Sequence, residues 1–362
     1  MRDQDILLWL SMTPGVGAVS IRRLIDHFGD WRLVWEADAA EMQRGAGVRK
    51  RMAHSLSLAR ATFDPIRLRS ELKTAGICYI SQADAEYPAA LLSIYDPPAG
   101  LFIIGTLPPT GDQALAVVGS RTSTTYGRAV TEKLIFALVA GGMTIVSGLA
   151  RGIDTIAHQA TLQAKGRTIA VLGSGLSQIY PRENVRLAQE IAGGGGAVIS
   201  EWAPQTHALP QNFPIRNRII AGLASGTLVV EAGEKSGSLI TADQALEQGR
   251  DVYAIPGQIT ARSSAGTNRL IQQGAKLVIT AADILEDYRL TPQPTPTEKT
   301  SLPPLDRDAQ LLLRAFDERE KHLDQLLACT GLPPGALHTT LLRLQLQGCI
   351  VALPGNRFWL RD

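Results

Sequence analysis

Short segments that combine glycine, serine and a single cationic side chain follow several apolar runs in this 362-residue chain. Glycine lets a ligand approach the backbone closely, and free amides at the start of a helix attract anions. Arginine and lysine add positive charge at the same places. We therefore predict a phosphate-binding rim, formed by Gly119, Ser120, Arg121, Gly148, Arg151, Gly173, Gly175, Lys235, Ser236, Gly237 and Ser238.

Two further clusters place basic side chains beside an aromatic residue, Tyr180 in the first and Phe213 in the second. Aromatic stacking combined with phosphate pairing is how proteins hold single-stranded nucleic acid without reading its sequence. The alternative is that these arginines form ordinary surface ion pairs with Glu183, Glu201 or Glu231. We include in the predicted nucleic-acid contact the side chains of Arg182, Arg186, Arg216, Asn217 and Arg218.

Other site chemistries have little support in the sequence. The dinucleotide fingerprint G-x-G-x-x-G is incomplete at 173–175, and no P-loop motif occurs. The histidines and cysteines show neither H-E-x-x-H nor C-x-x-C spacing, so we expect no metal, no cofactor and no catalytic residues. Asp154 and His158 stand four residues apart, which permits an acid–base or metal pair. A carboxylate–imidazole hydrogen bond that fixes the preceding loop is favoured, because no third ligand lies nearby.

The elements that must position these residues alternate regularly between 76 and 288. Apolar, β-branched runs occur at 114–118, 144–147, 168–172, 197–200, 227–230, 251–255 and 276–279. Helix-length segments occur at 126–140, 153–164, 186–192, 239–248, 268–273 and 281–288. This alternation predicts an α/β protein with a Rossmann-like, doubly wound, mostly parallel sheet that helices cover on both faces. Ligands of such sheets bind beyond the carboxyl ends of the strands, which is where the rim residues fall.

The overall composition restricts the class of protein. A net charge of +2 provides no global positive field, so any nucleic acid must bind through a local patch. No apolar stretch approaches the ~18 residues of a membrane span. Asp3 and Asp5 stand where a secretory signal would carry basic residues. The cysteines, at 78, 329 and 349, are odd in number and far apart, which fits a reducing cytoplasm.

Six blocks of the sequence resemble, in order and spacing, the DprA/Smf family. They include VGSR, SGLARGIDTIAH, GSGLSQIYPREN and FPIRNRIIAGLA, and they lie at 118–121, 147–158, 173–184, 213–224, 229–257 and 266–278. A lead-in segment at 87–105 is also similar to this family. The resemblance implies a cytoplasmic protein that binds and protects single-stranded DNA without sequence specificity during natural transformation. It further implies loading of the RecA recombinase, displacement of single-strand-binding protein, and no catalytic turnover.

The resemblance also implies a homodimer formed through the sheet domain. Leu270, Ile271 and Leu277 have polar neighbours, and they would form an apolar stripe at the edge of the sheet. An isologous contact would bury such a stripe twice. The alternative is that all three side chains belong to the core of their own domain.

The flanking segments are similar to those of longer family members. Residues 1–75 follow a helical period and resemble a sterile-alpha-motif-like domain, in which the turn at 15–17 is either a helix-hairpin-helix phosphate contact or a tight packing turn. The sheet domain spans 76–288, and a Thr/Pro-rich linker follows at 289–304. Three helices and a hairpin at 305–362 predict a winged-helix domain. Its recognition helix carries only Arg343 as a basic residue, so we do not expect it to read an operator.

Two other functions compete with DNA binding. A nucleotide-processing Rossmann enzyme related to nucleoside-monophosphate phosphoribohydrolases would use Glu231 as acid or base. The P-G-G-x-G-T-x-x-E loop of those enzymes is replaced here by EAGEKSGSLITA at 231–242. A winged-helix transcription factor with a ligand-sensing core would require sequence-specific binding to duplex DNA.

Overall fold

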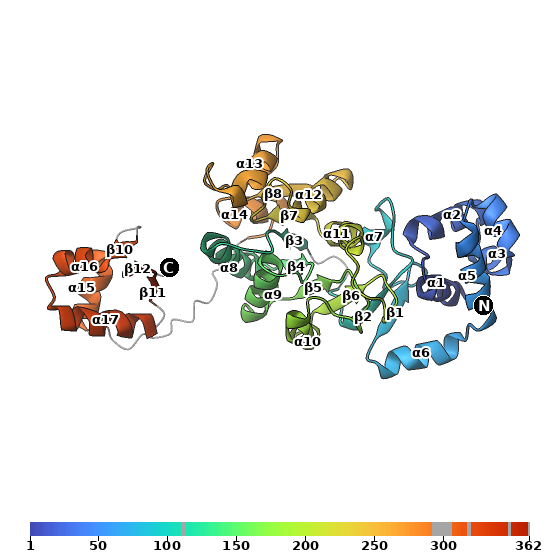
Figure 1. Ribbon diagram of the computed structural model, residues 1–362, viewed down its shortest axis with the longest axis horizontal. Coiled ribbons are helices and arrows are strands. Elements are labelled where there is room, and N and C mark those ends of the chain that lie inside the picture. Colours follow the sequence, from blue (N-terminus) through green and yellow to red (C-terminus); the bar gives the residue numbers. More distant parts are fainter. Residues whose placement is uncertain (110–112, 292–305, 317–319, 347–348, 361–362) are drawn as a thin grey trace. The chain divides into compact units, whose positions relative to one another are not determined.

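The computed structural model describes residues 1–109, 113–291, 306–316, 320–346 and 349–360 (Figure 1). The chain divides into two compact units, Met1–Thr295 and Pro296–Asp362, which are treated separately below. Residues 292–304 of the expected linker lie outside the described residues. Within the described part, no helix is long and apolar enough to cross a membrane.

A sheet of nine strands forms the centre of the larger unit in its described part, in the order β1-β2-β6-β5-β4-β3-β7-β8-β9. Seven neighbouring strands are parallel: β3 (Ala114–Val118), β4 (Thr144–Ser147), β5 (Thr168–Val171), β6 (Ala197–Ser200), β7 (Gly226–Val229), β8 (Asp251–Ala254) and β9 (Lys276–Leu277). The strands β1 (Cys78–Ser81) and β2 (Gly100–Gly105), which the sequence patterns did not reveal, extend one side in antiparallel fashion. The predicted Rossmann-like, mostly parallel sheet is confirmed.

Helices cover both faces of this sheet, so alternate residues of one strand enter different cores. Ala116 and Val118 of β3 belong to a core shared with α7 (Ala89–Leu92), α11 (Asn212–Gly222), α12 (Gly237–Glu247) and α13 (Ala265–Gln272). Leu115 and Val117 pack on the other face against α8 (Thr125–Ala140), α9 (Ile153–Gln163) and α14 (Ala282–Leu285). Burial on both faces explains the continuous apolar runs. The helix α11 was not predicted from the sequence.

Six helices precede the sheet: α1 (Asp3–Met12), α2 (Ala18–Phe28), α3 (Trp31–Glu36), α4 (Ala39–Gly45), α5 (Lys50–Ala61) and α6 (Pro65–Thr74). They have a core of their own, in which the rings of Trp9 and Trp35 meet edge to face at 5.0 Å. They also pack against the sheet, because Leu8 and Leu72 share a core with Phe102 of β2 and with α10 (Val185–Gly193). The boundary at residue 75 stays a prediction.

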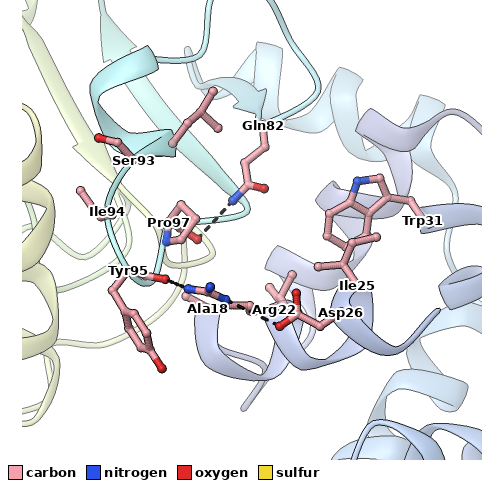
Figure 2. A pocket seen from close by; sticks show the side chains of 12 residues that line it. Ala18, Arg22, Ile25, Asp26, Trp31, Gln82, Ser93, Ile94, Tyr95 and Pro97 are labelled. Carbon is pink, nitrogen blue, oxygen red and sulfur yellow. Dashed lines mark hydrogen bonds and ion pairs between the residues drawn. The ribbon is translucent and has the colours of Figure 1, made fainter. Parts of the chain in front are cut away.

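A groove of about 510 Å³ separates α2 and α3 from the segment 92–97 (Figure 2). Arg22 of α2 crosses it, because its guanidinium donates to the carbonyl oxygen of Tyr95 and lies 4.8 Å from the centre of the Tyr95 ring. These contacts attach the amino-terminal helices to the lead-in segment of the sheet.

The described residues of the smaller unit form α15 (Arg307–Ala315), α16 (Leu323–Thr330) and α17 (Pro334–Leu346), together with a three-stranded sheet in the order β10-β12-β11. The strands are β10 (Lys321–His322), β11 (Ile350–Leu353) and β12 (Arg357–Leu360). Leu312, Leu326, Leu337 and Leu344 build its core. Three helices followed by a hairpin are the arrangement predicted for a winged helix.

Candidate nucleic-acid interface

The loops after β3 and β4 interlock at the carboxyl end of the sheet. The amide of Ile153 donates to the carbonyl oxygen of Ser120 over 3.1 Å. Gly152 adopts φ +72°, and a Cβ at this position would overlap the Ser120 carbonyl oxygen. Only glycine satisfies both conditions, so Gly152 fixes the two loops against each other.

A cavity of about 150 Å³ opens where these loops meet the segment before α10 and the start of α11. Arg121 stacks over Phe213, with its guanidinium carbon 5.4 Å from the ring centre. The ring of Tyr180, which is 46% exposed, lies 5.7 Å from that of Phe213. The cavity is lined by Arg121, Thr122, Gly148, Ala150, Arg151, Tyr180, Pro181 and Phe213. It therefore offers aromatic faces beside positive charge.

Arg151 enters this lining already paired with a carboxylate. Its guanidinium donates twice to Glu183, at 2.8 Å for each hydrogen bond. The hydrogen bond to Glu183 and the charge of that residue raise the pKa of Arg151, while Arg151 lowers the pKa of the Glu183 carboxyl. Both side chains are more than half exposed, at 60% and 52%, so the pair contributes little to stability. A phosphate could therefore replace Glu183.

Arg216 lies under the cavity and is 3% exposed, which corrects the expectation of a surface ligand. One of its guanidinium nitrogens donates to the carbonyl oxygen of Gly148 over 2.7 Å and to that of Val171. It thereby ties the ends of β4 and β5 together. Burial lowers the pKa of Arg216 to about 10, although the nearby Asp154 opposes this shift, so the guanidinium is charged at neutral pH.

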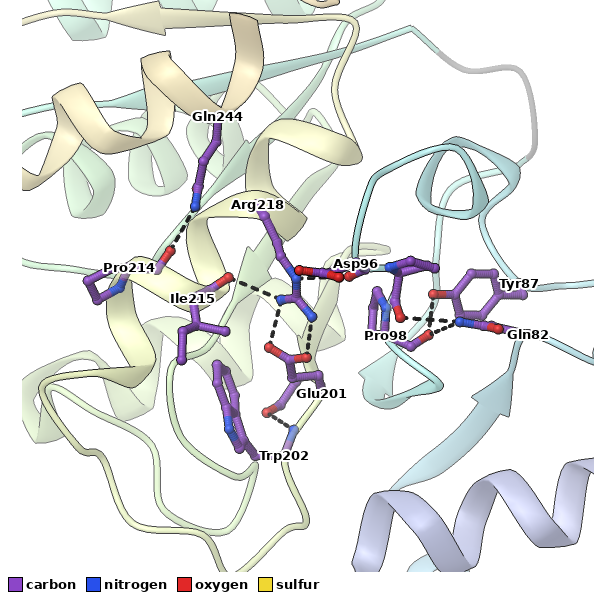
Figure 3. A network of polar contacts seen from close by, with 12 residues as sticks. Gln82, Tyr87, Asp96, Pro98, Glu201, Trp202, Pro214, Ile215, Arg218 and Gln244 are labelled. Carbon is purple, nitrogen blue, oxygen red and sulfur yellow. Dashed lines mark hydrogen bonds and ion pairs between the residues drawn. The ribbon is translucent and has the colours of Figure 1, made fainter. Parts of the chain in front are cut away.

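Arg218 is a second correction, because this residue is 9% exposed and its guanidinium is bonded to protein acceptors (Figure 3). It donates to both carboxylate oxygens of Glu201, at 2.8 and 2.6 Å, and to the carbonyl oxygen of Asp96 at 2.9 Å. Burial lowers the pKa of Arg218, but Glu201 outweighs this effect and keeps the pKa above its ordinary value. The ion pair with Glu201, which was the alternative considered from the sequence, does form, but it is buried and not on the surface.

The other predicted contact residues do not line the cavity. Arg182 is exposed, and Arg186 forms an exposed ion pair with Glu190 at 2.9 Å. The Ser236 side chain caps α12, beside exposed Lys235 and Gly237 and buried Ser238. Asn217 is half-buried and connects α11 to this segment, donating to the Gly237 carbonyl oxygen over 3.4 Å. Gly173 lies against Phe213, because a Cβ at this position would be 2.8 Å from the ring. Gly175 is buried, and its amide donates to the Thr206 carbonyl oxygen.

Asp154 and His158 do not bond to each other, contrary to expectation. The Asp154 carboxylate accepts from the amides of Gly148 and Ala150, at 3.1 and 3.4 Å, so it does fix the preceding loop. Burial raises the pKa of Asp154 despite Arg216 and these amides. His158 bonds Thr168 at 2.7 Å, and burial lowers its pKa to about 3. Among the described residues, no cluster of three side chains could hold a metal ion.

The residues expected at a dimer contact separate into two groups. Leu270 is 6% exposed and belongs to the core of its own domain, which fits the alternative weighed from the sequence. Ile271 packs against the same core but is only partly buried, so its place in a dimer contact stays a prediction. Leu277 on β9 is 40% exposed. The apolar residues exposed in this part of the chain include Ile259 and Ile279, at 94% and 77%, which the sequence analysis did not select.

The open, mostly parallel sheet, with a cationic and aromatic-lined cavity at the carboxyl ends of its strands, defines a Rossmann-like protein. The model of the family described as DNA recombination-mediator protein A matches residues 78–289, and that of the DprA winged helix domain matches 295–356. The chain belongs to the DprA/Smf family.

The relatives are similar over most of the chain. Protein Smf of Escherichia coli is 43% identical over 79% of this chain and 80% of its own length, and Protein Smf of Synechocystis is 34% identical over 99% of both. The solved DprA of Streptococcus pneumoniae has a TM-score of 0.68 and 38% identity over 79% of this chain and 98% of that one. The Helicobacter pylori DNA processing protein A, described for its unique single-stranded DNA binding mode, has a TM-score of 0.52 and 29% identity over 58% and 95%.

Proposed function

We propose that this protein binds single-stranded DNA at the cavity between the loops after β3 and β4. The observation that carries the proposal is the placement of Arg121 and Arg151 beside the rings of Tyr180 and Phe213. A base stacks on the aromatic faces while the guanidinium groups bind the adjoining phosphates. Every base has such a face, so binding is independent of sequence. The H. pylori relative, described for its single-stranded DNA binding mode, supports single-stranded DNA as the ligand.

The winged helix contributes no base readout in this proposal. Its helix α17 has a single arginine, Arg343, which pairs with Asp306 at 2.6 Å. A helix that reads the major groove presents several polar or cationic side chains to base edges. The third function considered from the sequence, an operator-binding regulator, is therefore disfavoured.

The finer parts of the proposal rest on family membership. We infer a cytoplasmic protein that protects incoming single strands during natural transformation and loads the RecA recombinase onto them, displacing single-strand-binding protein. It would act stoichiometrically, without turnover. The enzyme alternative needs Glu231 as an acid or base, but this side chain is 2% exposed and bonded to Thr124. Release of free base from nucleoside monophosphates would revive that alternative.

The proposed homodimer uses the end of the sheet at β9, where Leu277 and Ile279 are exposed. Burying both side chains twice across a twofold axis would give the contact an apolar centre. Light scattering of the full chain should show a dimer at micromolar concentration. A monomer at that concentration would contradict the assignment.

Fluorescence anisotropy with labelled oligonucleotides at several salt concentrations tests the DNA proposal. We expect tighter binding to single strands than to a duplex of the same sequence. For four to six phosphate contacts, log K should fall with log salt at a slope of roughly −3 to −4, at ~0.7 per phosphate. Equal or tighter binding to duplex would overturn the proposal.

A further inference from the structure

The centre of the sheet contains a topological switch point. From β3 the chain proceeds to β4, β5 and β6 on one side, and then crosses back to β7 on the other side of β3. β3 and β7 are parallel neighbours, with Ala116 opposite Thr227. In doubly wound sheets, the crevice beyond two such strands is where a nucleotide or similar ligand binds.

The side chain of Glu231 fills this crevice. It follows β7 by two residues and is 2% exposed. One carboxylate oxygen accepts from the amide of Thr124 over 2.9 Å, and the other accepts from the Thr124 hydroxyl over 2.5 Å. A Cβ on Gly127 would overlap the carboxylate, so the helix backbone comes directly against it. No room is left for the anionic group of a ligand.

The Glu231 carboxylate also places a negative charge at the N-terminus of helix α8, where free backbone amides carry partial positive charge. Helix α8 has no acidic residue in its first turn. The hydroxyl of Thr124, which donates to Glu231, accepts from the amide of Gly127 over 3.1 Å. Glu231 thus satisfies one amide directly and supports the bond to a second, at a helix end that favours negative charge.

We propose that Glu231 is a specificity-determining residue: its carboxylate is an internal substitute for the phosphate group of a free nucleotide and closes the switch point against that class of ligand. Anions are thereby confined to the neighbouring cavity at the ends of β3 and β4. The inference does not depend on the identity of the ligand in that cavity.

The test compares the thermal stability of the full chain in inorganic phosphate, in adenosine monophosphate and in chloride at equal ionic strength. In chloride, Glu231→Ala should melt several degrees below the wild type. Phosphate at about ten times its dissociation constant should raise the melting temperature of Glu231→Ala by about 2–4 °C more than that of the wild type. The matched control is Glu234→Ala, which removes an exposed carboxylate of the same loop and should gain nothing.

Glu231→Gln separates shape from charge. Its amide keeps the crevice filled, so it should lose stability without gaining a response to phosphate. If Glu231→Ala does not fold in chloride, it should fold in phosphate. The proposal is overturned if Glu231→Ala folds but is not stabilised by phosphate, or if the wild type is stabilised by phosphate as much as Glu231→Ala is. It is also overturned if Glu231→Ala folds in neither buffer while Glu231→Gln is as stable as the wild type. DNA affinity measured on the same samples tests the proposed function separately.

Discussion

The arginines at the ends of β3 and β4 and those of helix α11 have the same chemistry but opposite surroundings. Arg121 and Arg151 are exposed and line the cavity, whereas Arg216 and Arg218 are buried and bonded to backbone carbonyls or to Glu201. A buried guanidinium that is hydrogen-bonded to carbonyl or carboxylate oxygens organises structure, because releasing it would leave those partners without hydrogen bonds. The comparison teaches that clustered arginines in a sequence indicate a ligand site only after their carboxylate and carbonyl partners are known.

The largest expected effect comes from breaking the buried pair. Arg218→Ala leaves the Glu201 carboxylate buried without its partner and should lower the free energy of unfolding by about 3–5 kcal/mol. Urea unfolding measures this change. Arg67→Ala, which removes an exposed partner of Glu71, should leave the free energy of unfolding almost unchanged. If Arg218→Ala weakened DNA binding and left the unfolding midpoint unchanged, Arg218 would be a DNA contact and not a structural residue.

The exposed arginine should behave in the opposite way. In the proposed complex, Arg121→Ala would remove a charge-assisted phosphate contact, and it should weaken single-strand binding by about 1.5–3 kcal/mol, or roughly one to two decades. The loss should be similar for every sequence, and the salt slope should fall by about 0.7. Stability should change by less than about 0.5 kcal/mol. Anisotropy and melting measurements on this variant and on Arg67→Ala provide the check, and unfolding without selective loss of binding would remove Arg121 from the site.

The smallest effect should be a gain. Glu183 pairs with Arg151 of the cavity lining, so in the proposed complex it would compete with DNA for this guanidinium. Glu183→Gln should therefore raise single-strand affinity about two- to fivefold, with the increase greatest at low salt. Glu71→Gln, which breaks an ion pair of similar exposure on α6, is the matched control and should leave affinity unchanged. Weaker binding by Glu183→Gln would mean that the Arg151–Glu183 pair itself shapes the site.

The sequence was a good guide to the parallel sheet and a poor one to helix α11. Runs such as 114–118 are apolar throughout because both faces of the strand are buried, and that signal survives without tertiary information. Helix α11 is buried around much of its circumference and begins with Asn, Phe and Pro, so it shows no amphipathic period. For the same reason, the sequence alone predicts its arginines to be nucleic-acid contacts.

Part of the candidate site was also accessible from the sequence, since residues directly after parallel strands converge at one edge. The hydrogen-bond partners of the arginines could not be predicted from the sequence. Glu201 lies 17 residues from Arg218, and nothing in the sequence shows that α11 returns its guanidinium to the end of β6. Likewise, the sequence alone places Leu270 in an exposed apolar stripe, whereas in the structure α13 packs this side chain into the core. Contacts between distant segments decide which cations and which apolar side chains reach solvent.

The two-residue strand β9 has a consequence for how copies of this protein can associate. It ends the described sheet beyond β8, where Lys276 and Leu277 lie opposite Tyr253 and Ala254 and the amide of Val278 donates to the Ala254 carbonyl oxygen. A strand this short offers an incoming chain almost no backbone template, which is one way that sheets avoid uncontrolled edge-to-edge growth. A second copy that approaches here must bind through side chains. A short β9 therefore disfavours growth by strand addition, and a twofold contact through side chains at this end would close into a pair.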